Sequence, residues 1–315
     1  LQVGAPSGCG TAPGIRGDGL VFFHRREEGL VNQGGSVEAP ILVTGVPRSG
    51  TTWVARLLAL GPGLALAGRE PMNPRGRQYG LGGTLVGWTR LVEPTPRQVR
   101  ALRLAYRGLH PFTFSRYGHR QWAAPLPRTR VVIKDPFALL SIPAVVRATG
   151  AVVVLVYRHP GALLASYRLM GWTPDLEELR AVVEALPGAD GIPAIPAPGE
   201  VGPAEEMGVF WSALHLIALA DIAGDPVVRD RVHIVAHHEL AGGGPAAGRT
   251  AAEMLGIGWN AAMGGELARE SAGTARAGNL HNLDRSPAEV AAGWRAAIDP
   301  RELDEIGRVS SEALS

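Results

Sequence analysis

One segment of the chain places arginine, glycine and hydroxyl residues at a spacing that suits the binding of a phosphate. An apolar run at residues 41–45 ends in a turn, and the sequence continues as Pro47-Arg48-Ser49-Gly50-Thr51-Thr52-Trp53. An amphipathic pattern begins at Thr51, so the turn is predicted to lie at the N-terminus of a helix. Backbone N–H groups and the helix dipole converge at such a terminus. The sequence therefore predicts a site for a phosphorylated nucleotide at this turn.

The same segment argues against ordinary hydrolysis of ATP or GTP. Gly45 and Gly50 have the G-x-x-x-x-G spacing of a phosphate-binding loop. Thr51, however, occupies the position of the lysine that such loops carry, and the nearest cation, Arg48, lies earlier in the loop. The alternative is that this segment is an ordinary glycine-rich turn between a strand and a helix and binds no ligand.

A second segment has the same order of elements. The apolar run Val152–Tyr157 ends in Arg158, Pro160 begins a helical pattern, and Ser166 follows within that helix. The carboxyl ends of the strands surround the ligand in open α/β sheets, and a guanidinium can bind a phosphate through two parallel hydrogen bonds. Arg158 and Ser166 are therefore candidate phosphate ligands, with ordinary surface positions as the alternative.

The apolar pattern predicts an α/β fold, a P-loop-like three-layer sandwich with a central parallel sheet and helices on both faces. Strands are expected at short runs rich in Val, Ile and Leu, namely Ile41–Gly45, Leu64–Ala67, Arg130–Lys134, Val152–Tyr157 and Val232–Ala236. Helices are expected at Thr51–Leu60, Pro96–Arg107, Ala138–Ala148, Gly161–Met170, Leu176–Leu186, Glu205–Ala223, Gly248–Leu255 and Pro287–Ala297, and from Pro300 to the end.

The chain is predicted to be one domain with a tail. Residues 1–38 are rich in glycine and lack a periodic apolar pattern, so they are expected to be a flexible N-terminal tail with one short strand at Leu20–Phe23. Residues 39–315 would then form the domain. The Pro- and Gly-rich stretch 187–203 is expected to be a loop or lid within it.

Composition and charge exclude several classes of protein. A net charge of +2 with scattered arginines gives no reason to expect a nucleic-acid partner. The single cysteine, Cys9, excludes an intramolecular disulfide and a thiolate zinc site, and it fits a reducing, cytoplasmic compartment. We expect no transmembrane segment, because the longest apolar run, Ala151–Val156, has the length of a strand. Whether the chain forms a homo-oligomer is left open.

Together, the two phosphate-binding segments resemble those of sulfotransferases that use 3′-phosphoadenosine-5′-phosphosulfate (PAPS). The loop Pro47–Trp53 is similar to the 5′-phosphosulfate loop of that family, and Arg158-His159-Pro160 with Ser166 is similar to its 3′-phosphate segment. The resemblance extends from residue 40 to the C-terminus and is greatest to bacterial enzymes related to carbohydrate and tyrosylprotein sulfotransferases. It implies transfer of a sulfuryl group from PAPS to a hydroxyl of a glycan, glycolipid or secondary metabolite, without a metal.

The resemblance also implies roles for individual residues. Arg48 would stabilise the charge that develops on the leaving group, Trp53 would stack on adenine, and Arg158 and Ser166 would bind the 3′-phosphate, with Arg276 as a further candidate. The 5′-phosphosulfate would be bound by the loop and the helix that follows, at Arg48, Ser49, Gly50, Thr51 and Thr52.

The chain departs from the family pattern at two places. His159 stands where the family has Asn or Asp, which are better helix N-caps. The family's Tyr-Glu-Asp-Leu segment corresponds at best to His237-His238-Glu239-Leu240. His237 and His238 are predicted to end a strand and to point to opposite faces, which argues against a metal site there.

The general base is predicted from the same resemblance. Sulfuryl transfer requires the acceptor hydroxyl to lose its proton while cations neutralise the leaving group. The cytosolic enzymes use a histidine near a strand lysine, but Pro136 stands there after Lys134. The carbohydrate relatives use a glutamate after the second strand, which implies Glu70 as base and Lys134 as a stabilising cation. Reserve bases are Asp135, His110 and His119, and the cations expected to tune Glu70 are Arg69 or Arg75.

Two alternatives remain from the sequence. A nucleotide or metabolite kinase is disfavoured by the missing loop lysine, and Asp135 is its best candidate for binding Mg²⁺. A non-catalytic nucleotide-binding protein would leave Glu70 and Lys134 without a role. If the chain is a sulfotransferase, residues 72–130 and the stretch 187–203 are expected to form the acceptor pocket and its lid.

Overall fold

The computed structural model describes residues 38–74, 81, 88–109, 129–270 and 286–314 of the chain. The predicted tail up to residue 37, with its strand at Leu20–Phe23, lies outside these residues. So do four of the candidate site residues, which are Arg75, His110, His119 and Arg276.

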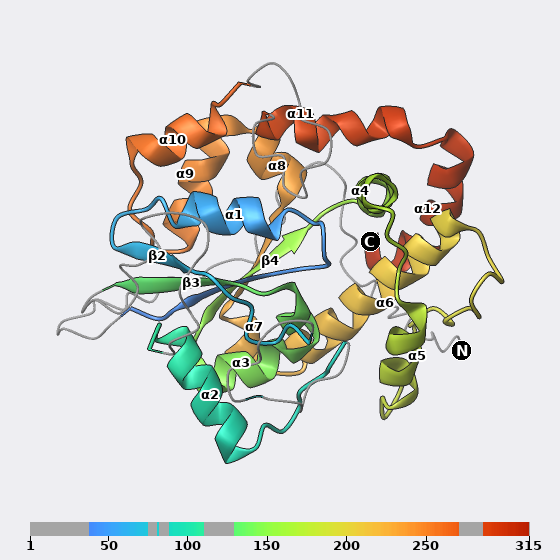
Figure 1. Cartoon of the computed structure of the whole chain (residues 1–315), viewed down its shortest axis with the longest axis horizontal. Coiled ribbons are helices and arrows are strands. Elements are labelled where there is room, and N and C mark those ends of the chain that lie inside the picture. The colour runs from blue at the N-terminus through green and yellow to red at the C-terminus, as the bar shows by residue number, and fades with distance from the viewer. Residues whose placement is uncertain (1–37, 75–80, 82–87, 110–128, 271–285, 315) are drawn as a thin grey trace, which may run out of the picture.

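A parallel sheet of five strands forms the centre of the described part of the chain (Figure 1). The strands are β1 (Ile41–Thr44), β2 (Leu64–Ala67), β3 (Arg130–Lys134), β4 (Val152–Tyr157) and β5 (Val232–Ala236). They lie in the order β2-β3-β1-β4-β5, with Leu42 of β1 level with Ile133 on one side and Val153 on the other. All five predicted strands are confirmed, although β1 ends one residue earlier than expected.

Helices cover both faces of the sheet, because successive apolar residues of each buried strand point to opposite faces. Ile41 and Val43 pack under one layer, and Leu42 packs under the other. The first layer contains α1 (Thr51–Leu58), α8 (His237–Gly242), α9 (Gly244–Met254), α10 (Ala261–Leu267) and α11 (Pro287–Ala292). The second contains α2 (Pro96–Tyr106), the 3₁₀ helix η2 (Pro136–Ser141), α3 (Ile142–Thr149), α6 (Pro203–Ala223) and α7 (Pro226–Arg229). The predicted three-layer sandwich is thus confirmed.

The remaining helices lie beyond the carboxyl ends of the strands, and most of them contact α6. They are α4 (Pro160–Met170), α5 (Leu176–Glu184), the 3₁₀ helix η3 (Gly293–Ala297) and α12 (Pro300–Leu314). The C-terminal helix α12 packs along α6, where Gly208 leaves room for Val309. This group of helices borders the edge of the sheet at which ligands bind in open α/β folds.

Three details of the predicted elements are wrong. The helix expected at Ala138–Ala148 is divided into η2 and α3, because Pro143 lies in the first turn of α3 and cannot donate to the preceding turn. His237 and His238 do not end a strand but begin α8. The helix expected at Pro287–Ala297 is α-helical only to Ala292 and continues as η3.

The expectation that no apolar stretch is long enough to span a membrane is also wrong as stated. By length and composition alone, α6 could cross a bilayer. Two thirds of its apolar stretch is nevertheless buried inside the protein, where Trp211, Leu214 and Ile217 belong to the core. Its apolar character is therefore explained by packing between the sheet and α12.

Candidate active site

A cavity of about 1010 Å³ lies at the carboxyl ends of the strands. Each strand contributes a lining residue from its last position or from the segment that follows it. These residues are Arg48 after β1, Glu70 after β2, Lys134 at the end of β3, Arg158 after β4 and His237 after β5. The two segments that the sequence singled out therefore line one cavity, together with the predicted base and its cation.

The loop between β1 and α1 has the backbone of an anion site. Gly50, at φ +98°, is the N-cap of α1 and offers no side-chain acceptor to the N–H groups of the first helical turn. Those N–H groups remain available to an anion. A Cβ at Gly50 would collide with the imidazole of His237, so the position requires glycine for both its conformation and its space.

Two hydrogen bonds join the first phosphate-binding segment to the second. Arg48 Nε donates to Ser166 Oγ at 2.9 Å, and Arg158 Nη1 donates to the backbone oxygen of Arg48 at 2.9 Å. Arg158 Nη2 also donates to the backbone oxygen of Val290 at 3.1 Å. The Arg48 guanidinium lies 5.7 Å from the ring centre of Trp172, and burial lowers its pKa. Arg48, Arg158 and Ser166 thus lie together, and their roles as phosphate ligands stay a prediction.

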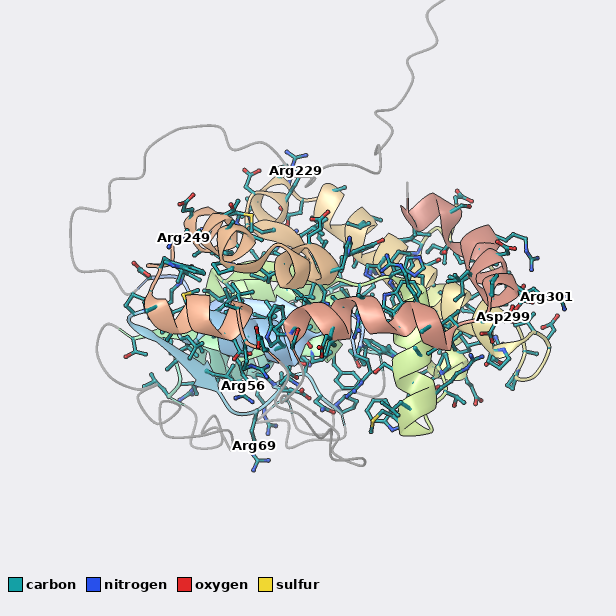
Figure 2. The ribbon with its side chains drawn as sticks, turned by 90° about the horizontal axis from the view of Figure 1, so that it is seen from above. Arg56, Arg69, Arg229, Arg249, Asp299 and Arg301 are labelled. Carbon is teal, nitrogen blue, oxygen red and sulfur yellow. The ribbon has the colours of Figure 1, made fainter. Side chains whose placement is uncertain are left out.

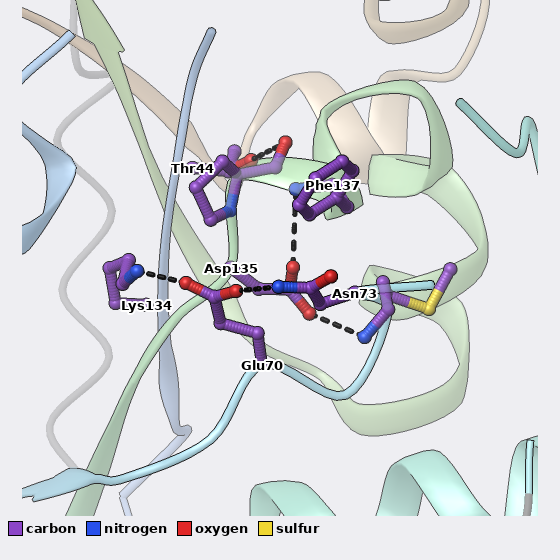
Figure 3. A network of polar contacts seen from close by, with 8 residues as sticks. Thr44, Glu70, Asn73, Lys134, Asp135 and Phe137 are labelled. Carbon is purple, nitrogen blue, oxygen red and sulfur yellow. Dashed lines mark hydrogen bonds and ion pairs between the residues drawn. The ribbon is translucent and has the colours of Figure 1, made fainter. Parts of the chain in front are cut away.

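Glu70 lies between two donors at the wall of the cavity (Figure 3). Its Oε1 pairs with Lys134 Nζ, and its Oε2 accepts a hydrogen bond from Asn73 Nδ2. Each carboxylate oxygen can accept a further bond, so both contacts leave the group able to take a proton. Arg69, which was expected to tune Glu70, points away from the body of the protein (Figure 2). Lys134 supplies the neighbouring positive charge instead.

Residues 40–186 match the model of the sulfotransferase family. The match spans the part of the chain from β1 to α5. The chain is accordingly an enzyme of the transferase class. In sequence alone, no curated protein matches the chain.

Solved sulfotransferases are similar to this chain in fold. The sulfotransferase domain of the Synechococcus PCC 7002 olefin synthase has a TM-score of 0.50 and 16% identity, over 88% of this chain and 94% of that domain. The sulfotransferase domain from the curacin biosynthetic pathway has a TM-score of 0.46 and 18% identity, over 87% of this chain and 97% of that one. Mouse sulfotransferase SULT7A1, solved in complex with PAP, has a TM-score of 0.44 and 15% identity, over 88% of this chain and 85% of that one.

Trp53 lines the cavity with a fixed orientation. Its Nε1 donates to Glu266 Oε1 of α10 at 3.0 Å, and its ring meets His237 edge-on at 5.4 Å between centres. Arg269 also pairs with Glu266 and lines the cavity. The stacking of Trp53 on adenine stays a prediction, and these contacts are the ones that would hold the ring for it.

His237 also lines the cavity, although the sequence analysis assigned it no role there. It packs against Gly50, and only 3% of its surface is exposed. Burial, and then the charges of Arg158 and His238, lower the pKa of His237 to about 3, so its imidazole is neutral. Its buried Nδ1 has no hydrogen-bond partner in the described structure. The sequence analysis placed His237 at a strand end, whereas it begins α8, and its contact with Gly50 depends on that difference.

His159 preserves the function of the residue that it replaces. Its Nδ1 accepts a hydrogen bond from Gly161 N at 3.1 Å and so caps α4, and its ring stacks on Trp294 at 4.7 Å. Burial, with a smaller contribution from Arg295, lowers the pKa of His159 to about 4, so the ring nitrogen stays an acceptor at neutral pH.

The acceptor side of the cavity agrees only in part with expectation. Asn73 and Trp88 from the predicted region and Pro198 from the predicted lid line it, while most of residues 75–128 lies outside the described structure. Further lining comes from the segment 171–178 after α4, and from Glu206 and Phe210 of α6. Among the described residues, no group of His, Cys, Asp and Glu side chains is arranged to hold a metal ion.

Proposed function

We propose that this enzyme transfers a sulfuryl group from PAPS to an acceptor hydroxyl. The observation that carries the proposal is the lining of a single cavity. The anion-binding loop, Arg158 and the Glu70–Lys134 pair all contribute to it, so a donor, a base and cations would meet there. At about 1010 Å³, the cavity is at the upper end of the range for small-molecule sites, which leaves room for an acceptor beside a nucleotide.

The described residues fit the donor. The uncapped N-terminus of α1 supplies N–H donors for the 5′-phosphosulfate, and Thr51 and Thr52 lie in its first turn. The buried Oγ of Ser49 has no hydrogen-bond partner in the described structure and is another donor at the loop. Arg158, with Ser166 linked to it through Arg48, would bind the 3′-phosphate that distinguishes PAPS from ATP.

The proposed reaction is an in-line displacement at sulfur. The acceptor oxygen forms a bond to sulfur as its proton passes to Glu70, and the bond from sulfur to the bridging phosphate oxygen breaks. 3′-Phosphoadenosine-5′-phosphate (PAP) leaves with the electron pair of that bond. Arg48 and Lys134 would stabilise the negative charge in this step, and Lys134 would also hold Glu70 as a carboxylate before it.

The acceptor is proposed to be an alcohol on a small molecule, glycan or glycolipid. This part of the proposal rests on the resemblance to enzymes with a carboxylate base, and the cytoplasmic location rests on the single cysteine, Cys9. Aromatic side chains along the cavity, such as Trp88, Trp172 and Phe210, offer apolar surface to the body of such an acceptor.

A thermal-shift titration tests the donor directly. PAP at about 100 times its dissociation constant is expected to stabilise the protein by about 2.7 kcal/mol, which is visible in a melting curve. AMP and ADP should stabilise it less at equal concentration, because they lack the 3′-phosphate. A preference for ATP with Mg²⁺ would point to a kinase. The absence of a shift with any nucleotide would contradict the proposed donor site.

An Arg158→Ala variant is expected to bind PAP about 10- to 100-fold more weakly, the worth of one lost charge-assisted contact. Its affinity for AMP should change by less than about threefold, because AMP carries no 3′-phosphate. Calorimetric titration of both nucleotides measures the difference. Arg168→Ala is the matched control, since Arg168 lies on α4 and pairs with Glu302 outside the cavity lining. Equal losses for PAP and AMP would contradict the assignment.

A further inference from the structure

A buried carboxylate ties the turn that carries Glu70 to the strand that carries Lys134. Asp135 Oδ2 accepts a hydrogen bond from the backbone N–H of Met72 at 2.6 Å, and Oδ1 accepts one from Phe137 N at 3.2 Å (Figure 3). Asp135 N donates to Val43 O at 3.0 Å, which fixes its backbone against the central strand. The side chain therefore connects β3, η2 and the turn after β2.

Asp135 directly follows Lys134, so its hydrogen bond to Met72 N acts next to the ion pair between Lys134 and Glu70. One strand end supplies the cation that pairs with Glu70 and the carboxylate that holds the turn two residues beyond Glu70. Asn73, next in that turn, donates to the second oxygen of Glu70. The separation of Glu70 from Lys134 is therefore fixed by Asp135 as well as by their own ion pair.

Asp135 itself is poorly placed to act on a substrate. Its side chain is fully buried, whereas Glu70, Asn73 and Lys134 line the cavity. Burial, and then the charge of Glu70, raise the pKa of Asp135 well above its ordinary value, although its two N–H donors act in the opposite direction. A buried group that accepts two backbone N–H bonds is costly to remove and serves to fix the local geometry.

We propose that Asp135 is a positioning residue for the base, because its bond to Met72 N holds the turn that aims Glu70 into the cavity. The proposal rests on the proposed sulfuryl transfer with Glu70 as base. It differs from a simple capping role at η2, which needs only the bond to Phe137 N.

A double-mutant cycle tests the proposal with PAPS and water as the reactants. In this hydrolysis, water attacks sulfur, its proton passes to Glu70, and PAP leaves, so PAP release measures the rate without a known acceptor. Asp135→Ala is expected to lower the rate by about 10²-fold, the cost of a misplacement near 1 Å. In a Glu70→Gln background, the same change should alter the rate by less than about threefold, because both variants remove the same function.

Two further variants keep the test decisive. Asp135→Asn retains one acceptor oxygen for Met72 N and is expected to recover part of the rate, and it replaces Asp135→Ala if that variant does not fold. Asp225→Ala is the matched control, because Asp225 caps α7 through two backbone N–H bonds without lining the cavity. It should reduce stability and leave the rate unchanged.

The outcomes separate the inference from the proposed function. If the losses of Asp135→Ala and Glu70→Gln multiply, or if Asp135→Ala weakens PAP binding as much as it slows the reaction, the positioning role is wrong. If Glu70→Gln keeps the wild-type rate, the base assignment is wrong. If the wild-type protein neither binds PAP nor releases it from PAPS, the proposed function is wrong.

Discussion

A Glu70→Gln variant is expected to transfer sulfuryl groups about 10²- to 10⁴-fold more slowly than the wild-type enzyme, the range for loss of a general base. The amide has nearly the same shape as the carboxylate and can still contact Lys134 or Asn73, but it cannot take the acceptor proton. The proposed donor site does not include this group, so the affinity for PAP is expected to stay within about threefold of wild type. PAP release from PAPS and calorimetric titration with PAP give the two quantities.

The control for this prediction is a carboxylate with the same kind of partner outside the cavity. Asp221 forms an ion pair with Arg90 at 2.5 Å and is not part of the cavity lining. Asp221→Asn should therefore leave both turnover and PAP affinity unchanged. An unimpaired Glu70→Gln variant would show that another group takes the proton, whereas equal losses in turnover and PAP affinity would indicate a damaged site.

The sheet and the position of the two candidate phosphate-binding segments at its edge could be predicted because local pattern determines them. A parallel strand buried on both faces is a short apolar run, such as Val152–Tyr157, and its carboxyl end marks the ligand edge of the sheet. Arg158 follows one such run directly, and Arg48 lies in the turn that follows another. Their meeting required only that β1 and β4 be neighbours, which the structure bears out.

Contacts between distant segments could not be predicted in the same way. Met72 N is satisfied by Asp135, although nothing in the sequence around either residue indicates the other. Asp135-Pro136 is a helix-start signal, but the sequence around it offers Asp135 only as a reserve base or a candidate Mg²⁺ ligand. His237 reaches Gly50 because β5 lies beside β4 and α8 begins at once, and the order of strands is a property of the whole fold.

Substitution of Arg48 is expected to have the second large effect on the rate of sulfuryl transfer, and its backbone conformation allows a matched pair of variants. Arg48 has φ +74°, the only described non-glycine residue in the left-handed region, which costs such a residue on the order of 1 kcal/mol. Both Arg48→Gly and Arg48→Ala remove the guanidinium, its bond to Ser166 and its contact with Trp172. Both are expected to slow sulfuryl transfer by about 10²- to 10³-fold, as when one donor to the developing charge is lost.

The two Arg48 variants should differ in stability, because only glycine adopts this backbone conformation without strain. Arg48→Gly is expected to unfold with a free energy about 1 kcal/mol higher than Arg48→Ala, measured from denaturant midpoints at equal m-values. Equal stabilities would mean that the backbone at residue 48 is not strained. An Arg48→Gly variant that transfers sulfuryl groups at the wild-type rate would show that the guanidinium does not stabilise the leaving group. The expected result, a slow variant with the less strained loop, would indicate that the strain at this position is maintained for the placement of a cation at the leaving group.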